Sequence, residues 1–356
     1  MHKKKLLIIG PDPVRSLGGM ATVVRSILNS DQLKARYDIA MYPSFIDGPL
    51  PKRVAYSLMR EWAFGFKRPD FDIYHIHICS GTSTWRKLRY INKLGENARR
   101  VVLHVHGAQY HVFWEECSSQ QKEKIRAAFA HVGKAIVLSE EWLDYFVENQ
   151  ICDPNKLAVL HNAVEIPNRQ VNVSEHHDVL FLGRLDSRKS PDVLLRAAKV
   201  VLKEHPQVRF RFGGDGDIAK YRALSEELGI ADSCDFLGWT TGKRKEDAIR
   251  NSRIYCLPSK HEGMPMSVLE AMSYGLATIA TPVGGVPQVI KDDVNGYLMP
   301  VDDWNLLASR ICSLVDNPSL AERIGTEGRA TIESDFGMDT FASNLSEVYE
   351  SVSENL

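Results

Sequence analysis

The chain has 356 residues, of which 44% are hydrophobic and 25% charged, and its formal net charge at pH 7 is −1. This length exceeds one ordinary α/β domain and suits two, and the apolar content is sufficient for two cores. The balanced charge excludes a protein that binds nucleic acid through a global excess of basic residues.

The first residues, MHKKKLLIIGPDP, combine a basic start with an apolar run, as a secretory signal does. The run from Leu6 to Ile9 is much shorter than the apolar region of a signal peptide, and prolines follow it, so we expect a buried first strand. No stretch approaches the length that crosses a bilayer. The six scattered cysteines contain no CxxC pair and fit a reducing cytoplasm.

Short apolar runs alternate with amphipathic stretches along the first half, a pattern typical of parallel α/β sheets. Helices are predicted near residues 19–28, 84–94, 120–131 and 140–148. The polar, proline-containing stretch 165–178 has neither period and is predicted to be a linker. The predicted strands are Lys5–Gly10, Asp72–His77, Val101–His106, Ala135–Ser139 and Leu157–His161.

The same pattern begins again after the linker. Strands are predicted at Val179–Gly183, Val208–Gly213, Cys234–Leu237, Ile254–Pro258 and Ala277–Thr281, and helices near 191–203, 218–228, 243–251 and 266–274. The sequence therefore predicts two tandem doubly wound domains, residues 1–164 and 179–337, followed by an amphipathic helical segment, 338–356. Ligands of such sheets bind at the carboxyl ends of the strands, where the strand order reverses.

The most specific motif is HEGMPMSVLE over residues 261–270, followed by PVGG at 282–285. Pro265 suits the first turn of a helix, and the free N–H groups after it form an anion site. A carboxylate within this helix repels phosphate, so Glu270 is expected to bind sugar hydroxyls, which can donate two hydrogen bonds to one carboxylate. A solvent-exposed helical glutamate is the alternative.

A second motif, GRLDSRKS at 183–190, stands between a predicted strand and a helix. Arg184 and Lys189 are expected to converge on one site from the two ends of this loop. Two cations suit a diphosphate, whose negative charge grows as it leaves; a pair of surface bases is the alternative. Gly18 and Gly19, after the first strand, permit close approach of a ligand, although they do not form GxGxxG.

Together these motifs resemble family 4 of the glycosyltransferases over nearly the whole chain. The resemblance includes the first glycine pair, HVHG at 104–107, GRLDSRKS, GGDG at 213–216, PVGG, and Glu262 and Glu270 in E-x7-E spacing. It implies a GT-B fold with two Rossmann-like domains. The N-terminal domain would bind the acceptor and the C-terminal domain the nucleotide sugar, and the last helix would pack back on the N-terminal domain.

The resemblance also implies a role for each matching residue. Glu270 would hold the ribose hydroxyls, Glu262 would lie beside the donor sugar, and His106 would lie near the same sugar and the reacting centre. Met264 stands where many relatives carry phenylalanine or leucine, which leaves the donor sugar open. The diphosphate would be bound by Arg184, Lys189 and the N–H groups of Met266 and Ser267, and Gly18 and Gly19 would lie close to it. The sugar hydroxyls would contact the backbone of Gly263 and Met264. The base would lie against the turn Gly238-Trp239.

The implied reaction is hexosyl transfer with retention of anomeric configuration and without a metal or other cofactor. The departing diphosphate would take the acceptor proton, with His106, Arg184, Lys189 and Glu262 as the catalytic residues. A UDP-sugar is the favoured donor and GDP-mannose the next. The acceptor implied is a glycan on a polyprenyl diphosphate carrier, in surface polysaccharide biosynthesis.

Two other functions share this architecture. A sugar-nucleotide epimerase would need no acceptor, and a non-catalytic sensor would only bind the nucleotide sugar. An NAD-dependent oxidoreductase is disfavoured because the glycine fingerprint and its following acidic residue are missing.

Four histidines are candidates for a metal site. His75 and His77 share one face of a predicted strand, and His104 and His106 share one face of another. Four imidazoles could hold zinc. No carboxylate or cysteine joins them at ligand spacing, so we expect no metal.

A membrane surface is predicted in the first domain. In a helix over 53–67, Val54, Leu58, Trp62 and Phe66 form a stripe expected to face the core, with Arg60 and Phe64 on the opposite side. Arg86 and Lys87 begin a basic run that extends to Arg100. Aromatic residues among bases predict contact with an anionic membrane, on the inner face of the plasma membrane; an ordinary basic exterior is the alternative.

Overall fold

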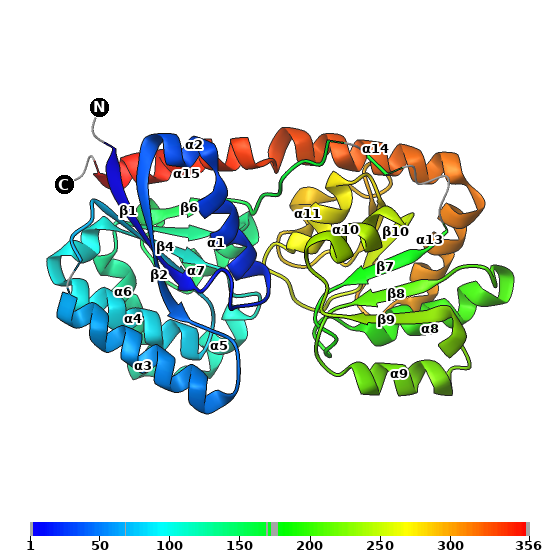
Figure 1. Cartoon of the computed structure of the whole chain (residues 1–356), viewed down its shortest axis with the longest axis horizontal. Coiled ribbons are helices and arrows are strands. Elements are labelled where there is room, and N and C mark those ends of the chain that lie inside the picture. Colours follow the sequence, from blue (N-terminus) through cyan, green and yellow to red (C-terminus); the bar gives the residue numbers. More distant parts are fainter. Residues whose placement is uncertain (1–2, 68, 169, 172–176, 354–356) are drawn as a thin grey trace. The chain divides into compact units, whose positions relative to one another are not determined.

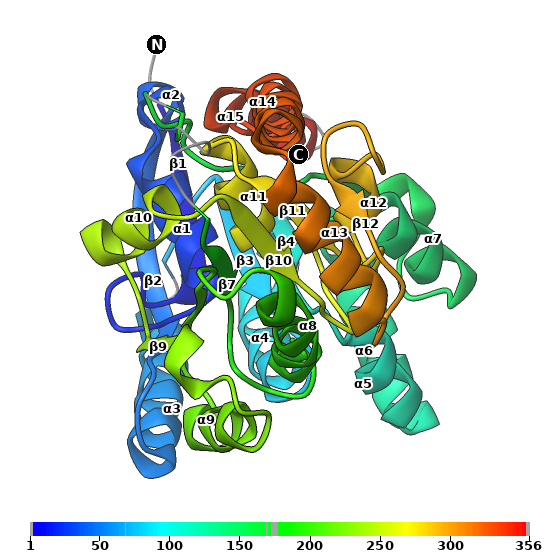
Figure 2. The same cartoon turned by 90° about the vertical axis from the view of Figure 1, so that its right-hand side faces the viewer.

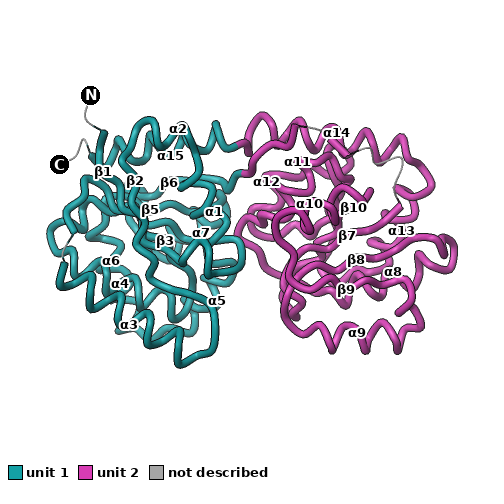
Figure 3. The backbone as a smooth tube through the Cα atoms, in the orientation of Figure 1, with its two compact units in different colours: residues 1–163, 338–356 teal, residues 164–337 magenta. Residues whose placement is uncertain are grey.

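The computed structural model describes residues 3–67, 69–168, 170–171 and 177–353. The chain divides into two compact units, residues 1–163 with 338–356 (unit 1) and residues 164–337 (unit 2), shown in Figure 3. The sequence predicts a linker over 165–178; residues 169 and 172–176 of that stretch lie outside the described residues. The α/β class and the GT-B fold expected from the sequence are confirmed by two parallel sheets, each flanked by helices.

Unit 1 contains a parallel sheet whose described strands have the order β2-β1-β3-β4-β5-β6. The first strand pairs with β2 on one side and β3 on the other, so the strand order reverses beside β1. The strands are β1 (Lys4–Pro11), β2 (Tyr37–Phe45), β3 (Ile73–Ile78), β4 (Val101–Val105), β5 (Lys134–Val137) and β6 (Leu157–Val159). Strand β2 was not predicted from the sequence, because its alternation is irregular and it contains Pro43.

Helices cover both faces of this sheet (Figure 1). On one face α3 packs on β2, and α4 packs on β3 and against α3 and α6. On the other face α1 packs on β1, and the C-terminal helix α15 packs on β3 and β4. The helices of the unit are α1 (Gly19–Asn29), α2 (Asp31–Arg36), α3 (Leu50–Lys67), α4 (Thr82–Leu94), α5 (Tyr110–Glu116), α6 (Ser119–His131), α7 (Glu140–Glu148) and α15 (Met338–Ser353).

Unit 2 repeats this plan with the described strand order β12-β11-β10-β7-β8-β9. Its first strand, β7, pairs with β8 and β10, so the order reverses beside β7. All of its ladders are parallel, and β7, β10 and β11 are buried throughout, as expected for strands covered on both faces. The strands are β7 (Val179–Leu182), β8 (Phe210–Gly213), β9 (Cys234–Gly238), β10 (Ile254–Leu257), β11 (Ala277–Ala280) and β12 (Tyr297–Leu298).

The helices of unit 2 also lie on both sides of their sheet. Figure 2 shows α8 and α13 side by side, and α14 packs on α11 and β11. Arg253 is fully buried, and its guanidinium donates to the carbonyls of Leu314 and Val315 in the last turn of α13. The helices are α8 (Pro191–Glu204), α9 (Ile218–Glu227), α10 (Gly242–Arg250), α11 (Met266–Ser273), α12 (Val286–Val289), α13 (Trp304–Asp316) and α14 (Pro318–Asp335).

Candidate active site

The two strongest motifs meet where the strand order of unit 2 reverses. GRLDSRKS follows β7 and HEGMP follows β10, and these two strands are neighbours in the sheet. Because the strands are parallel, the two loops emerge at the same edge. This is the place where doubly wound sheets bind their ligands.

A buried ion pair joins the two loops. Lys189 Nζ lies 2.6 Å from Glu262 Oε1, and both residues are buried. Arg188 Nη1 lies 3.6 Å from Glu262 Oε2 and donates to the carbonyl of His261. Burial lowers the pKa of Lys189 below its ordinary value, although Glu262 acts in the opposite direction. Glu262 is therefore held between two cations in a partly desolvated site.

The PVGG turn packs against the backbone of the HEGMP loop. Gly285 N donates to Gly263 O at 2.6 Å, and the side chain of Met264 is buried. Gly284 has φ +58°, and a Cβ atom placed on it would lie 2.1 Å from Glu262 O. Only glycine combines this backbone conformation with so close an approach. PVGG thus fixes the position of the Glu262 backbone.

Arg184 lies apart from this pair. Its guanidinium lies 3.7 Å from Asp186 and 3.6 Å from Asp215 of the GGDG loop, and 60% of its side chain is exposed. The GGDG loop in turn holds the Arg184 loop, because Leu185 N donates to Asp215 O at 2.7 Å. Arg184 is exposed and its two carboxylate contacts are longer than 3.5 Å, so its guanidinium is accessible to a ligand.

Glu270 has a basic partner. It lies on α11, and its Oε1 accepts from Nζ of Lys245 on α10 at 2.6 Å. Both side chains are partly exposed, so the carboxylate remains open to a ligand. Met266 and Ser267, whose roles are implied by resemblance, form the first two positions of α11, where backbone N–H groups have no partner within the helix.

The turn expected to hold the base lies at the end of β9. Gly238 has φ +68° with open space where a side chain would be, and Trp239 is exposed. Gly214 N donates to Gly238 O, so this turn is tied to the GGDG loop. These contacts place the turn beside the GGDG loop that follows β8.

In unit 1, Gly18 and Gly19 stand at the start of α1, the first helix after β1. Gly18 has φ +97° and forms the N-cap of α1, and a Cβ atom there would meet open space. The backbone near Gly18 is therefore accessible.

The four histidines form one array (His75, His77, His104 and His106). His106 Nε2 lies 2.9 Å from His77 Nδ1, and His75 Nε2 lies 3.1 Å from His104 Nδ1. Tyr349 of α15 completes the array, with its hydroxyl 2.7 Å from His75 Nδ1. Burial lowers the pKa of His106 to about 3, so its imidazole is neutral at pH 7.

Three of these rings are also the best metal-ligand candidates of unit 1. His75, His77 and His104 each offer a nitrogen within 4.8 Å of the others. The His75 and His104 nitrogens that face each other are already hydrogen-bonded, and the group contains no acidic ligand. The Nε2 atoms of His77 and His104 have no hydrogen-bond partner among the described residues. Buried nitrogens of this kind need a water or another donor or acceptor. A second group, Glu204, His205 and Cys312, lies on the surface of unit 2.

The residues predicted to meet a membrane are placed differently from the expectation. Phe64 is buried and makes edge-to-face contacts with Tyr42 and Tyr90, so its predicted exposure is wrong. Arg60 stacks over the Tyr42 ring at 3.9 Å. An aromatic cluster on β2 and α4 therefore covers the face that was expected to be outside.

The first two bases of the basic run, on α4, are also directed toward the interior of unit 1. Lys87 is buried, and its ammonium donates to Ile9 O and Ser44 Oγ, so its predicted position on the surface is wrong. Burial lowers the pKa of Lys87 well below its ordinary value, with Arg86 adding to the effect. Arg86 is partly buried, with its guanidinium 4.9 Å from the centre of the Phe45 ring.

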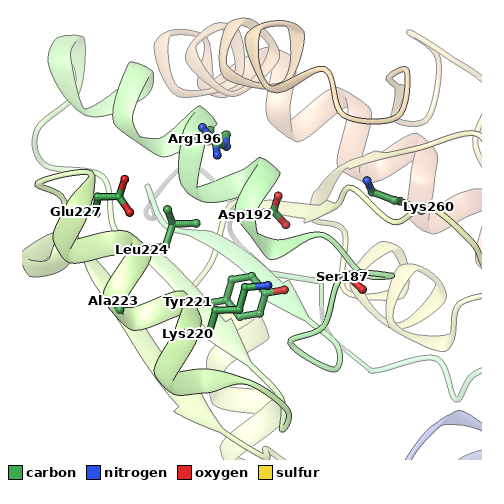
Figure 4. Close-up of a pocket in the computed structure, with 9 residues that line it drawn as sticks. All are labelled: Ser187, Asp192, Arg196, Lys220, Tyr221, Ala223, Leu224, Glu227 and Lys260. Atoms are coloured by element: carbon green, nitrogen blue, oxygen red, sulfur yellow. The ribbon is translucent and has the colours of Figure 1, made fainter.

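A separate cavity of about 450 Å³ lies between α8, α9 and the loop that carries Ser187 (Figure 4). Cations and carboxylates both line it, and none of the residues assigned to donor binding does. Because its lining carries both signs of charge, the cavity has no preference for an anion such as a diphosphate. The lining residues are Ser187, Asp192, Arg196, Lys220, Tyr221, Ala223, Leu224, Glu227 and Lys260.

Three site residues were missed from the sequence. Arg188 lies within the quoted GRLDSRKS motif, but its contact with Glu262 needs the second loop. Asp215 stands in GGDG, and its contact with Arg184 was not predictable from local spacing. Lys245 belongs to the basic run KRK at the start of α10, which the sequence analysis did not consider. All three contacts join segments distant in sequence.

Comparisons with known proteins agree with this geometry. Residues 164–331 match the family of glycosyl transferases group 1. The D-inositol 3-phosphate glycosyltransferase of Streptomyces scabiei is 32% identical over 57% of this chain and 50% of its own length. The phosphatidyl-myo-inositol mannosyltransferase of Mycobacterium tuberculosis is 33% identical over 49% of this chain and 47% of its own. The chain thus spans about half the length of these curated relatives.

Solved structures resemble the chain over nearly its whole length. Sucrose-phosphate synthase from Thermosynechococcus elongatus has a TM-score of 0.80 at 18% identity, covering 99% of this chain and 100% of its own. HepE from Anabaena, solved with UDP and glucose, has a TM-score of 0.76 at 16% identity, covering 98% and 100%. No helix among the described residues is long and apolar enough to span a bilayer. The chain has the GT-B fold, and its residues 164–331 match the glycosyl transferases group 1, the family type that the motifs indicated.

Proposed function

We propose that the chain is a retaining glycosyltransferase that moves a hexose or related sugar from a nucleotide diphosphate sugar to a glycan acceptor. The observation that carries this proposal is the set of charges where the strand order of unit 2 reverses. Lys189, Arg188 and Arg184 offer positive charge for a diphosphate, and Glu270 offers a carboxylate for ribose hydroxyls. The match of residues 164–331 to the group 1 family supports the same conclusion.

The reaction requires that negative charge be stabilised on the leaving group. The acceptor hydroxyl oxygen attacks the anomeric carbon, the bond from that carbon to the diphosphate oxygen breaks, and the departing diphosphate takes the acceptor proton. Arg184, Lys189 and the free N–H groups of Met266 and Ser267 would stabilise the departing charge. Glu262, with the backbone of Gly263 and Met264, would orient the donor sugar.

His106 has a separate role in this proposal. Its low pKa keeps the imidazole neutral, so it can donate or accept a hydrogen bond with a sugar hydroxyl. Nε2 of His106 is already hydrogen-bonded to Nδ1 of His77. His106 therefore orients the donor sugar rather than supplying positive charge. Gly18 and Gly19 would let the donor phosphates approach the backbone of unit 1.

We propose a UDP-sugar as donor, with GDP-mannose as the next choice. HepE was solved with UDP and glucose, which supports the first, and the mycobacterial relative is named a mannosyltransferase, which supports the second. The base would lie at Gly238 and Trp239.

We propose a lipid-linked glycan on a polyprenyl diphosphate as acceptor, in surface polysaccharide biosynthesis at the cytoplasmic face of the membrane. Unit 1 would bind this acceptor and unit 2 the donor. Two relatives carry inositol in their names, one of them as a phospholipid, so inositol phosphates and phosphatidylinositol belong in the acceptor panel.

No metal is assigned to the chemistry. The cations of the two loops and the start of α11 would take the part that a divalent ion plays in other transferases. Of the histidine array of unit 1, only His106 takes part in the proposed chemistry.

The test is nucleotide release from a panel of UDP- and GDP-sugars, with and without acceptors. Release that depends on an acceptor and yields a glycosylated product of retained configuration supports the proposal. Conversion of the sugar without release would indicate an epimerase, and binding without either would indicate a sensor.

A further inference from the structure

Helix α3 turns its most apolar face to solvent. Leu50, Val54, Leu58, Trp62 and Phe66 follow one another at intervals of four residues, and all are exposed. Trp62 is 69% and Phe66 80% exposed, and their rings stack at 5.4 Å. The expectation that this stripe faces the core is wrong. Clusters of exposed large apolar residues mark interaction surfaces more often than single ones do.

The face is broad as well as long. At about 100° per residue, nearly half the circumference of α3 contains no polar side chain. The opposite side carries the buried Ser57 and Phe64, and it packs on the sheet through β2. The residues of the apolar half are Pro51, Val54, Ala55, Leu58, Met59, Trp62, Gly65 and Phe66.

Figure 1 shows α3 as the outer helix of unit 1, with α4 beside it. No other described helix has so many exposed large apolar residues: α3 holds six of them, Leu50, Val54, Leu58, Met59, Trp62 and Phe66. The helix has 18 residues and a length of about 27 Å. The apolar face is therefore a continuous ridge and not a pocket.

Exposed bases stand near both ends of α3. Lys52 borders the apolar half at the start of the helix, and Lys67 is exposed at its end. Arg53 and Arg60 lie on the opposite side, over the rings of Phe45 and Tyr42. Glu61 is the one acidic residue of the helix, and its carboxylate is paired with Arg89. An apolar ridge with aromatic residues and exposed bases near its ends has the chemistry of a helix that lies in the headgroup layer of an anionic bilayer.

We propose that α3 is a membrane-docking helix, seated parallel to an anionic lipid surface with Trp62 and Phe66 among the acyl chains. The inference rests on the proposed function for its purpose, because a lipid-linked acceptor is presented at a bilayer. The excess of bases over acids on α3 commits the proposal to lipid and not to a second protein. The surface differs from the predicted one, since Phe64 and Lys87 are buried and take no part.

The test is co-sedimentation of the full chain with vesicles of phosphatidylcholine alone or mixed with phosphatidylglycerol. We expect binding to the anionic vesicles that weakens at high salt. Trp62→Ser with Phe66→Ser should reduce the bound fraction at least tenfold, and Lys52→Glu with Lys67→Glu should also reduce it. Val200→Ser with Val294→Ser, which changes exposed apolar residues of unit 2, is the matched control and should bind as the wild type does.

Two results would overturn the proposal. One is a wild type that stays in the supernatant with anionic vesicles at low salt. The other is a wild-type dimer, detected by light scattering, that Trp62→Ser with Phe66→Ser converts to a monomer, since a second copy would then cover the ridge. Nucleotide release from a UDP-sugar, measured without vesicles on the same variants, tests the proposed function separately and should not change.

Discussion

Lys189 Nζ and Glu262 Oε1 lie 2.6 Å apart although 73 residues separate them in sequence. Both side chains are almost fully buried, and Arg188 approaches the other carboxylate oxygen. A buried pair of this kind contributes little net stability, but removing Lys189 leaves the buried Glu262 carboxylate with only the more distant Arg188 as a cation beside it. Lys189 therefore has two separable effects: one on folding through Glu262 and one on any diphosphate that binds beside it.

Lys189→Ala and Arg184→Ala should both lower kcat more than they raise KM, because the charge of the diphosphate grows in the transition state. Only Lys189→Ala should also destabilise the fold, by about 3–5 kcal/mol, because it leaves the Glu262 carboxylate without its closest cation. Arg184 is 60% exposed, and its removal should cost little stability. Steady-state kinetics and urea denaturation measure the two effects.

The double variant Lys189→Ala with Glu262→Gln provides the control. It removes the unpaired charge, so it should regain much of the lost stability without regaining activity. A KM rise with unchanged kcat in both single variants would show that these cations only bind substrate.

Gly284→Ala should weaken donor binding at least tenfold while the chain still folds. The new Cβ would lie 2.1 Å from Glu262 O, so the HEGMP loop must move. Calorimetry with UDP measures the change. Gly229→Ala is the matched control, since Gly229 also has a positive φ, +73°, but open space around it. Equal affinities for both variants would show that PVGG does not position the site.

Stability should fall with acid because of the histidine array. Burial, and then the nearby His106, lower the pKa of His75 to about 3, and burial lowers that of His106 to about 3. An unfolded histidine titrates near 6.5, so below this pH the unfolded chain binds protons that the folded chain excludes. Each such histidine should cost about 1.4 kcal/mol per pH unit as the pH falls from 6.5 toward 3.

Urea denaturation between pH 8 and pH 5 measures this loss. His75→Phe should reduce the slope, although it removes the contacts of His75 with Tyr349 and His104. The measurement to compare is the pH slope and not the absolute stability. An unchanged slope in the variant would show that His75 is already protonated in the folded state.

Activity should persist in saturating EDTA, because side-chain cations and the start of α11 are proposed to take the place of a metal. His75→Gln should behave in the same way, since His75 belongs to the candidate metal group of unit 1 and its ring hydrogen-bonds Tyr349 and His104, not His106. Loss of activity in EDTA that zinc or manganese restores would contradict the proposal and would point to that group.

Several features of the fold were predictable from local pattern. The buried strands β1, β3 and β4 and the strands β7, β10 and β11 are short apolar runs bounded by turns, and their order along the chain predicts parallel sheets. The motif loops follow strands, so their position at one edge of a sheet could be inferred. The predicted strand 208–213 begins two residues before β8, an ordinary error at an element boundary.

The orientation of α3 was not predictable in the same way. Both sides of this helix carry aromatic residues, and hydrophobic period alone does not say which side the protein covers. Phe64 is buried by Tyr42 of β2, a strand that the sequence analysis missed. Because β2 was not predicted, nothing indicated what would cover the side of α3 that carries Phe64. The longer apolar stripe, which ends at Phe66, was therefore expected to face the core.

The burial of Lys87 was also not predictable from local sequence. Its position in a run of bases suggested a solvated surface, but its ammonium reaches Ile9 O on β1 and Ser44 Oγ on β2. The contacts come from strands 43 and 78 residues away, so no local rule could reveal them. The pairing of Lys245 with Glu270 was hidden for the same reason.

We propose that the loops after β7 and β10, with Glu270 on α11, bind a nucleoside diphosphate. Titration calorimetry of UDP and GDP against wild type, Glu270→Ala and Glu246→Ala tests it most directly. Glu246 is the matched control, an ion-paired glutamate on α10 that is assigned no ligand. We expect wild type to bind at least one nucleotide. Binding should weaken by about 1.5–3 kcal/mol for each hydrogen bond lost in Glu270→Ala and should be unchanged in Glu246→Ala. Equal nucleotide affinity in wild type and Glu270→Ala, or no binding of either nucleotide by the wild type, would contradict it.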